Sequence, residues 1–162
     1  MPFAAIALGS NLGDRDAHLR HAIGRIGGLG SVRAVSTFHD TAPVGNTAQP
    51  RFLNAALLLE TAPASQQSAL ALMSALLAIE RDLGRDRAAA PPKGPRTLDL
   101  DLLLYGALVL DLPATAAHPA LTLPHPEMHL RRFVLAPLAE IAPGLVHPTT
   151  GRTIAQLLAA LS

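Results

Sequence analysis

The sequence predicts an α+β sandwich, in which helices cover one face of an antiparallel sheet and substrate loops occupy the other. Two observations support this expectation. Apolar segments of strand and helix type follow one another in the order β-α-β-β-α-β, which is the ferredoxin-like order. Hydrophobic residues make up 49% of the 162 residues and charged residues 15%, a balance typical of chains that bury a core. At about 150 residues per domain, residues 1–162 are expected to form a single domain.

The charge and composition exclude several functional classes. Thirteen Lys and Arg against twelve Asp and Glu leave a formal charge of +1, so no overall field would hold a nucleic acid or an anionic membrane. Four Phe, one Tyr and no Trp offer few rings on which single-stranded bases could stack. The chain has no cysteine, and residues 1–8 lack the basic residues of a signal peptide. We therefore expect a cytoplasmic monomer that binds neither nucleic acid nor membrane.

The first strand and the first helix follow from local patterning. Residues 3–8 (FAAIAL) are a short apolar run closed by Gly-Ser-Asn, as in a buried strand that ends in a turn. From Asp14 onward, Leu19, Ile23 and Ile26 recur at helical spacing until two glycines end the pattern.

The next two strands enclose a long loop. Residues 32–39 (VRAVSTFH) are rich in β-branched side chains, which favour a strand. Residues 41–50 contain Pro, Gly, Asn and Gln, and a long loop inside a compact domain is often functional. Residues 52–61 (FLNAALLLET) fit a helix or a strand by composition, but their place between this loop and Pro63 favours a strand.

The second half of the chain continues the alternation. Residues 65–83 show leucines at helical spacing and end at a glycine, so we expect a long helix there. A loop at 85–95 then leads into a strand at 97–104. The remaining expected elements are a turn at Gly106, a hairpin strand at 107–110, and short helices at 132–138 and 154–161, the last packing its leucines on the core.

The strongest chemical signal lies between residues 80 and 101, which hold ten charged side chains. On a strand, Asp99 and Asp101 project from one face while the intervening leucines project from the other. Two neighbouring carboxylates repel each other unless a cation neutralises them, and Mg²⁺ is the divalent ion that carboxylates and nucleotide phosphates commonly share. An isolated Asp-x-Asp is about equally well explained as a charged edge strand that blocks aggregation.

The basic residues near this pair favour the first interpretation. Arg85, Arg87 and Arg96 lie on or beside a loop rich in glycine and proline, and arginine binds phosphate oxygens through two parallel donors. A triphosphate would account for them, and a solvated surface loop is the alternative. The N-terminal GSNLGD segment lacks the Gly-Lys-Ser/Thr of a Walker loop, so nucleotide binding would proceed without one.

Histidines and phenylalanines supply further candidates. His125 and His129 stand four residues apart, but Pro126 disfavours a helix between them, so we do not expect a zinc pair. Either histidine could donate to a phosphate, although a loop histidine is more often a surface residue. Phe52 and Phe133 each lie beside polar segments and could offer a ring face to a flat heterocycle, whereas core packing is the default role of each.

Five blocks of the sequence, taken in order, resemble a known family. They are ALGSNLGD at 7–14, TAPVG with QPRFLNA at 41–55, E-R-x-L-G-R at 80–85, GPRTLDLDLLLYG at 94–106, and LPHPEMHLRRFVLAPLAEIAP at 123–143. These blocks are similar to those of 6-hydroxymethyl-7,8-dihydropterin pyrophosphokinase of folate biosynthesis, and they run nearly from end to end of the chain. The resemblance implies an enzyme that transfers pyrophosphate from ATP to the hydroxymethyl group of 6-hydroxymethyl-7,8-dihydropterin, giving AMP and the pterin diphosphate.

The resemblance also implies roles for individual residues. Asp99 and Asp101 would hold two Mg²⁺ ions, and Arg85 and Arg96 would act with them on the triphosphate as catalytic residues. The implied ATP-binding residues are Glu80, Arg85, Arg87, Arg96, His125 and Arg131, with Arg132 as the alternative to Arg131. The implied pterin-binding residues are Thr41, Val44, Phe52, Asn54 and Phe133.

Two other functions remain open at this point. A metal-dependent phosphohydrolase would use the same aspartates and arginines on ATP alone. A ferredoxin-like ligand-binding module would bind without catalysing a reaction.

Overall fold

The computed structural model describes residues 3–43, 48–84 and 97–161. The elements occur in the order β1 (Phe3–Ser10), α1 (Arg15–Ile26), β2 (Ser31–Val35), β3 (His39–Thr41), β4 (Phe52–Glu60), α2 (Gln66–Asp82), β5 (Asp99–Tyr105), β6 (Leu110–Leu112), β7 (Leu121–Leu123), the 3₁₀ turn η1 (Met128–Leu130), α3 (Arg132–Ile141) and α4 (Ile154–Ala159).

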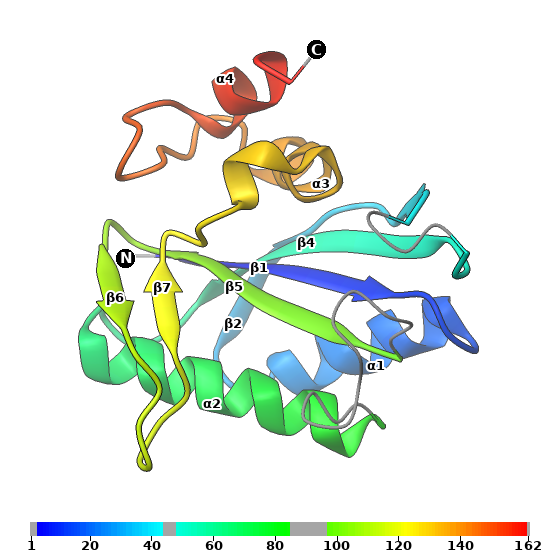
Figure 1. The fold of residues 1–162 in the computed structure, drawn as a ribbon, viewed down its shortest axis with the longest axis horizontal. Helices are drawn as coiled ribbons and strands as arrows, with labels where there is room; N and C mark the ends of the chain where they lie inside the picture. The colour runs from blue at the N-terminus through cyan, green and yellow to red at the C-terminus, as the bar shows by residue number, and fades with distance from the viewer. Residues whose placement is uncertain (1–2, 44–47, 85–96, 162) are drawn as a thin grey trace.

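The main sheet is antiparallel and has the strand order β2-β4-β1-β5, with the short β3 extending the edge next to β4. This order, with helices α1 and α2 as the two connections across the sheet, is the ferredoxin-like arrangement that the sequence predicts (Figure 1). Strand β1 lies in the interior and pairs with β4 on one side and β5 on the other. Its C-terminal end therefore meets the N-terminal ends of both neighbours.

Helices α1 and α2 cover one face of this sheet. Their apolar sides pack on alternate residues of the strands, such as Ile6 of β1, Leu57 of β4 and Leu100 of β5, all fully buried. Asp14 caps α1 by accepting a hydrogen bond from the Ala17 amide, as expected from its position at the helix start.

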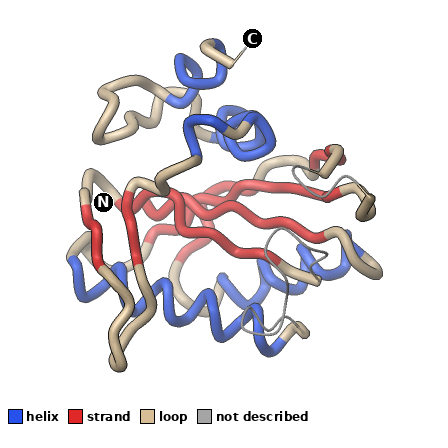
Figure 2. Tube along the Cα trace, in the orientation of Figure 1, coloured by secondary structure: helices blue, strands red, loops and turns tan. Residues whose placement is uncertain are grey.

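The opposite face carries helices as well as loops. Helix α3 packs across β4, and α4 packs against α3 (Figure 2). Leu135, Leu138 and Ile154 are fully buried in this second cluster. Because β4 is covered on both faces, its sequence is a continuous apolar run, which is why composition alone fitted helix and strand equally. The structure confirms the strand.

Two expectations about strands need correction. Residues 107–110 do not form a hairpin with β5, because a turn at Gly106, with φ of 55°, carries the chain away and β6 pairs with β7 instead. This pairing places Leu110 opposite Leu123 and Leu112 opposite Leu121, so that both leucines of β7 are buried. The segment expected as one strand at 32–39 is divided into β2 and β3.

The division between β2 and β3 has a local cause. The buried Ser36 still donates its amide to the Ala56 carbonyl, but the Ala56 amide donates to the Ser36 hydroxyl, both at 2.9 Å, so the regular ladder is interrupted there. Among the residues that the structure describes, no helix has the length and apolar character needed to cross a membrane.

Candidate active site

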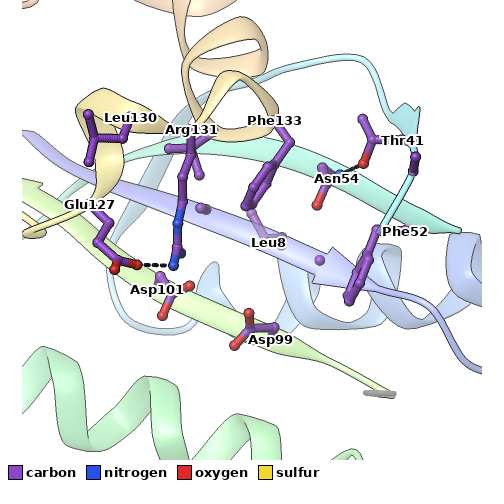
Figure 3. Close-up of a pocket in the computed structure, with 14 residues that line it drawn as sticks. Leu8, Thr41, Phe52, Asn54, Asp99, Asp101, Glu127, Leu130, Arg131 and Phe133 are labelled. Atoms are coloured by element: carbon purple, nitrogen blue, oxygen red, sulfur yellow. Dashed lines mark hydrogen bonds and ion pairs between the residues drawn. The ribbon is translucent and has the colours of Figure 1, made fainter. Parts of the chain in front are cut away.

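A cavity of about 270 Å³ lies beside α3, on the same face of the sheet. Its floor is the sheet, where the end of β1 meets the starts of β4 and β5, and its wall is the segment from η1 into α3 (Figure 3). Fourteen described residues line it: Ala7, Leu8, Gly9, Thr41, Ala42, Phe52, Asn54, Asp99, Asp101, Glu127, Leu130, Arg131, Phe133 and Val134.

The two aspartates share one face of β5, as their spacing predicts. Asp99 and Asp101 are partly exposed and line the cavity, whereas Leu98, Leu100 and Leu102 are buried on the helix side. Figure 3 shows both carboxylates projecting from β5 into the same space. The structure therefore brings together two anionic groups in a concave site, which is the arrangement that a divalent cation stabilises.

Glu80 lies in the interior behind these aspartates. It is 1% exposed, and its Oε2 accepts a hydrogen bond of 2.7 Å from the amide of Leu100, the residue between Asp99 and Asp101. The carboxylate of Glu80 thus anchors the backbone of β5 at the position from which both aspartates project. Its direct part in ATP binding stays a prediction.

Two phenylalanines form the sides of a slot beside the aspartates. Phe52 projects from β4 and Phe133 from the start of α3, and in Figure 3 the Phe133 ring lies over Leu8 of β1 while the Phe52 ring lies nearer the end of that strand. Gly9 forms the floor, because its position pairs with Asn54 on one side and Asp99 on the other. A Cβ on Gly9 would lie 3.2 Å from Asn54 Oδ1, so a side chain there would narrow the slot.

A polar pair closes one end of this slot. Asn54 is 5% exposed, and its Nδ2 donates to Thr41 Oγ1 at 2.5 Å. Thr41 lies in β3, whose register places it opposite Phe52. The slot therefore combines two ring faces with an oriented amide and hydroxyl, the combination that a flat, polar heterocycle needs for stacking and orientation.

Arg131 reaches into the cavity from the η1–α3 wall, above the aspartates. Its guanidinium forms an ion pair with Glu127 and lies with Cζ 5.6 Å from the centre of the Phe133 ring (Figure 3). The neighbouring Arg132 points elsewhere and donates to the Leu161 carbonyl at 3.3 Å. Of the two arginines that the sequence left open, only Arg131 lines the cavity.

Glu127 is a cavity residue that the sequence reasoning missed. It precedes Arg131 by four positions, a spacing that places acidic and basic side chains together on a helical turn and could have indicated the pair. The exposed Leu130 also lines the cavity and carried no sequence signal, because a single leucine in a loop predicts nothing.

Some of the predicted site residues lie elsewhere. His125 is partly exposed and its Nδ1 accepts from the Glu127 amide at 3.2 Å, but it does not line this cavity. Val44, Arg85, Arg87 and Arg96 lie outside the described residues. Within residues 3–43, 48–84 and 97–161, no group of three or more His, Cys, Asp or Glu side chains has the arrangement of a metal site.

The rim next to Thr41 is held by a charged network. Asp40 accepts from Arg51 Nε at 2.8 Å and from Arg15 at 3.2 Å, so that β3 is tied to α1 and to the start of β4. The hydrogen bonds from Arg51 and Arg15 hold the pKa of the Asp40 carboxyl below its ordinary value.

A buried polar contact holds the turn after β1. Asn11 of the GSNLGD segment donates to Gln49 Oε1 at 2.9 Å, which fixes this turn against the segment that precedes β4.

Comparison with known families gives a match over most of the chain. Residues 5–143 match the family described as 7,8-dihydro-6-hydroxymethylpterin-pyrophosphokinase (HPPK). This range includes every described residue that lines the cavity.

Curated relatives agree with the family match. A 2-amino-4-hydroxy-6-hydroxymethyldihydropteridine pyrophosphokinase from Pseudomonas aeruginosa is 43% identical over 157 residues, which cover 96% of this chain and 89% of the relative. A protein of the same name from Bacillus subtilis is 41% identical over 140 residues, covering 85% and 77%.

Solved structures share the fold. A Plasmodium falciparum HPPK-DHPS, wild type with STZ-DHP, superposes with a TM-score of 0.75 at 14% identity, and an HPPK-DHPS in complex with substrates superposes with a TM-score of 0.71 at 13% identity. The matches cover 98% of this chain but only 41% and 43% of those longer chains. At this level of identity the likeness establishes the fold.

Proposed function

The chain belongs to the 7,8-dihydro-6-hydroxymethylpterin-pyrophosphokinase family of folate biosynthesis, and we propose that the cavity between β1, β4, β5 and α3 is its active site. The reaction moves the β,γ-pyrophosphoryl group of ATP to the hydroxymethyl oxygen of 6-hydroxymethyl-7,8-dihydropterin and releases AMP. One observation carries the assignment of the site: an aromatic slot and a pair of carboxylates adjoin each other across Gly9.

The slot accounts for the pterin. Phe52 and Phe133 would stack on its faces, while Asn54 and Thr41 would meet the amide and amino edge of the ring. Because Gly9 pairs with both Asn54 and Asp99, a pterin in the slot would direct its hydroxymethyl group toward the aspartates. Val44, which lies outside the described residues, is proposed to complete this contact on the basis of its sequence match.

The carboxylates account for a divalent cation. Asp99 and Asp101 are the two acidic residues on the β5 side of the cavity, and Mg²⁺ commonly uses one or two carboxylates while water and nucleotide phosphates complete its shell. The residues present therefore fit Mg²⁺, and two ions are proposed. When bound, the metal would neutralise charge on the phosphates. Glu80 would keep the β5 backbone fixed while this charge accumulates.

Arginines are proposed to bind the triphosphate. Arg131 is held in the cavity by Glu127 and by the ring of Phe133, so its guanidinium is already oriented before ATP arrives. Arg85, Arg87 and Arg96, which lie outside the described residues, are assigned to the triphosphate by their match to the family sequence alone. His125 and Glu80 complete the proposed ATP site by the same match.

The remaining proposals concern the whole chain. We propose that residues 1–162 act as one pyrophosphokinase domain, as a cytoplasmic monomer, with ATP and the pterin as its partners and no nucleic acid or membrane.

The identity of the nucleotide product tests the reaction. Phosphorus NMR of the chain with Mg²⁺, ATP and 6-hydroxymethyl-7,8-dihydropterin should show AMP and pterin diphosphate and no ADP. Formation of ADP would mean an ordinary kinase, and release of inorganic phosphate without pterin would mean a phosphohydrolase. Binding of pterin without any product would mean a non-catalytic module.

A matched pair of substitutions tests the site. Asp99→Asn keeps the shape and removes the charge, and should lower kcat by about 10²–10³-fold, because several kcal/mol of charge stabilisation are lost. Asp16→Asn on the exposed face of α1 is the control and should leave kcat unchanged. Equal kcat values in the two variants, with unchanged circular dichroism, would exclude this cavity as the active site.

A further inference from the structure

We propose that Glu140 is a positioning residue, which holds the two sides of the pterin slot at a fixed separation by tying α3 to β3. The inference rests on the proposed function, since it assigns a task to a residue outside the cavity. Glu140 lies near the C-terminal end of α3 and faces the edge of the sheet rather than the slot.

Three hydrogen bonds converge on its carboxylate. Oε1 accepts from the Thr37 amide at 2.7 Å, and Oε2 accepts from Thr37 Oγ1 at 2.9 Å and from His39 Nε2 at 2.8 Å. The partners are more than 100 residues apart in the sequence. These hydrogen bonds hold the pKa of the Glu140 carboxyl below its ordinary value, and the one from the Thr37 amide has the largest effect. The carboxylate is therefore charged at neutral pH, and it binds Thr37, just before β3, and His39, the first residue of β3.

The helix side of this contact leads to one wall of the slot. Phe133 and Val134 line the cavity from the first turn of α3, and Glu140 follows Phe133 by about two turns on the same side of the helix. Between the two positions α3 contains Pro137, which removes one helical hydrogen bond, but the buried Leu135 and Leu138 hold this stretch of the helix against the sheet, so the two ends of α3 move together. Fixing Glu140 therefore fixes where the Phe133 ring stands above the sheet.

The strand side leads to the opposite wall. His39 pairs with Asn54 across the β3–β4 ladder, and Thr41 pairs with Phe52. His39, which contacts Glu140, therefore lies directly opposite a residue that lines the slot. Asn54 in turn donates to Thr41 at 2.5 Å. The path from Phe133 through α3, Glu140 and His39 thus reaches Asn54 at the end of the slot and, through Thr41, the Phe52 side.

Strand β3 has a structural reason to need such a tie. It is only three residues long, it lies at the edge of the sheet, and its ladder with β4 is separated from that of β2 by the interruption at Ser36. So short an edge strand is poorly fixed by its own ladder, because edge positions pair on one side only. Asp40 ties β3 to Arg15 and Arg51, and the carboxylate of Glu140 adds the attachment to α3.

The test separates slot geometry from general stability. Glu140→Gln keeps the shape and one acceptor, and Glu140→Ala removes both acceptors. The matched control is Glu60→Gln, which removes the charge from another edge ion pair, formed with Arg33 at 2.9 Å at the far end of β4. Steady-state kinetics with each substrate varied, and titration of 6-hydroxymethylpterin in the presence of Mg²⁺ and a non-hydrolysable ATP analogue, supply the readouts.

We expect Glu140→Ala to raise the KM and the Kd for pterin about tenfold, Glu140→Gln by a smaller factor, and both to leave kcat and the KM for ATP within about twofold of wild type. Glu60→Gln should change none of these values. Thr37→Val, which removes one hydroxyl only, serves as a milder variant if Glu140→Ala fails to fold, and it should raise the pterin KM while leaving kcat unchanged.

Two results would overturn the proposal: a pterin KM and Kd unchanged in the Glu140 variants, or a rise that Glu60→Gln reproduces. If the wild-type chain makes no AMP, the proposed function fails, but the pterin titration still reports whether Glu140 sets the slot. If the wild type makes AMP and the Glu140 variants bind pterin normally, only this inference fails.

Discussion

Replacing the buried Glu80 tests how the fold holds the aspartate-bearing strand. The carboxylate is 1% exposed, and its Oε2 accepts from the Leu100 amide at 2.7 Å. A hydrogen bond to a charged acceptor contributes about 1.5–3 kcal/mol, and a buried donor left unpaired costs about 1–3 kcal/mol. Glu80→Ala removes the buried acceptor of the Leu100 amide, so we expect a loss of about 3 kcal/mol in the free energy of unfolding.

This loss should be visible in thermal unfolding. For a chain of this size, 1 kcal/mol lowers Tm by about 2–4 °C, so Glu80→Ala should lower it by roughly 6–12 °C. Glu80→Gln retains an acceptor oxygen at nearly the same place, and it should lose about 1 kcal/mol, or roughly 2–4 °C. Circular dichroism followed at 222 nm during heating gives both values.

The control is the neighbouring exposed carboxylate on the same helix. Asp82 pairs with Arg25 at 2.8 Å, and its side chain is 56% exposed. An exposed ion pair contributes about 0–1 kcal/mol, so Asp82→Ala should lower Tm by no more than about 4 °C. A Tm for Glu80→Ala no lower than that of Asp82→Ala would refute the argument. Equal losses in Glu80→Ala and Glu80→Gln would mean that the charge of Glu80, rather than its bond to Leu100, stabilises β5.

Two further predictions concern the slot and the C-terminal region. Gly9→Ala would place a Cβ 3.2 Å from Asn54 Oδ1, so it should raise the KM for pterin about tenfold and leave the KM for ATP unchanged, measured by steady-state kinetics. Burial, together with the nearby His129, lowers the pKa of His147 from 6.5, so the unfolded chain binds the proton more readily, and stability falls as the pH drops below 6.5. His147→Asn keeps an acceptor for the Thr149 and Thr150 amides. Between about pH 7 and pH 5, the free energy of unfolding of this variant, measured with urea, should fall by about 0.5–1 kcal/mol less than that of the wild type. An equal fall in both proteins would contradict this prediction.

Local periodicity was sufficient to predict much of the fold. A strand has a side-chain period of two, so the alternation of leucine and aspartate from Leu98 to Leu102 already specified which residues enter the core and which face the ligand. The long helix at 65–83 followed from its leucine spacing and its glycine stop, and the structure has it at Gln66–Asp82. The family blocks added the match of these residues to pterin and ATP chemistry.

The sequence could not predict contacts between distant segments. The expected hairpin at 107–110 was wrong, because the choice between β5 and β7 as partner depends on how leucines pack in three dimensions, not on the turn itself. The burial of Glu80 behind β5 was equally invisible, because its hydrogen bond to the Leu100 amide joins residues 20 positions apart in the sequence.

The sequence alone determined that Asp99 and Asp101 share one face of a strand while the intervening leucines enter the core, because the side-chain direction within one element depends on local backbone geometry. Only the tertiary structure decided that Arg131 rather than Arg132 enters the cavity, and that Glu140 reaches His39. Those two facts depend on the packing of α3 across the sheet. That packing is the sum of many weak apolar contacts between segments far apart in the chain, and no local pattern encodes it.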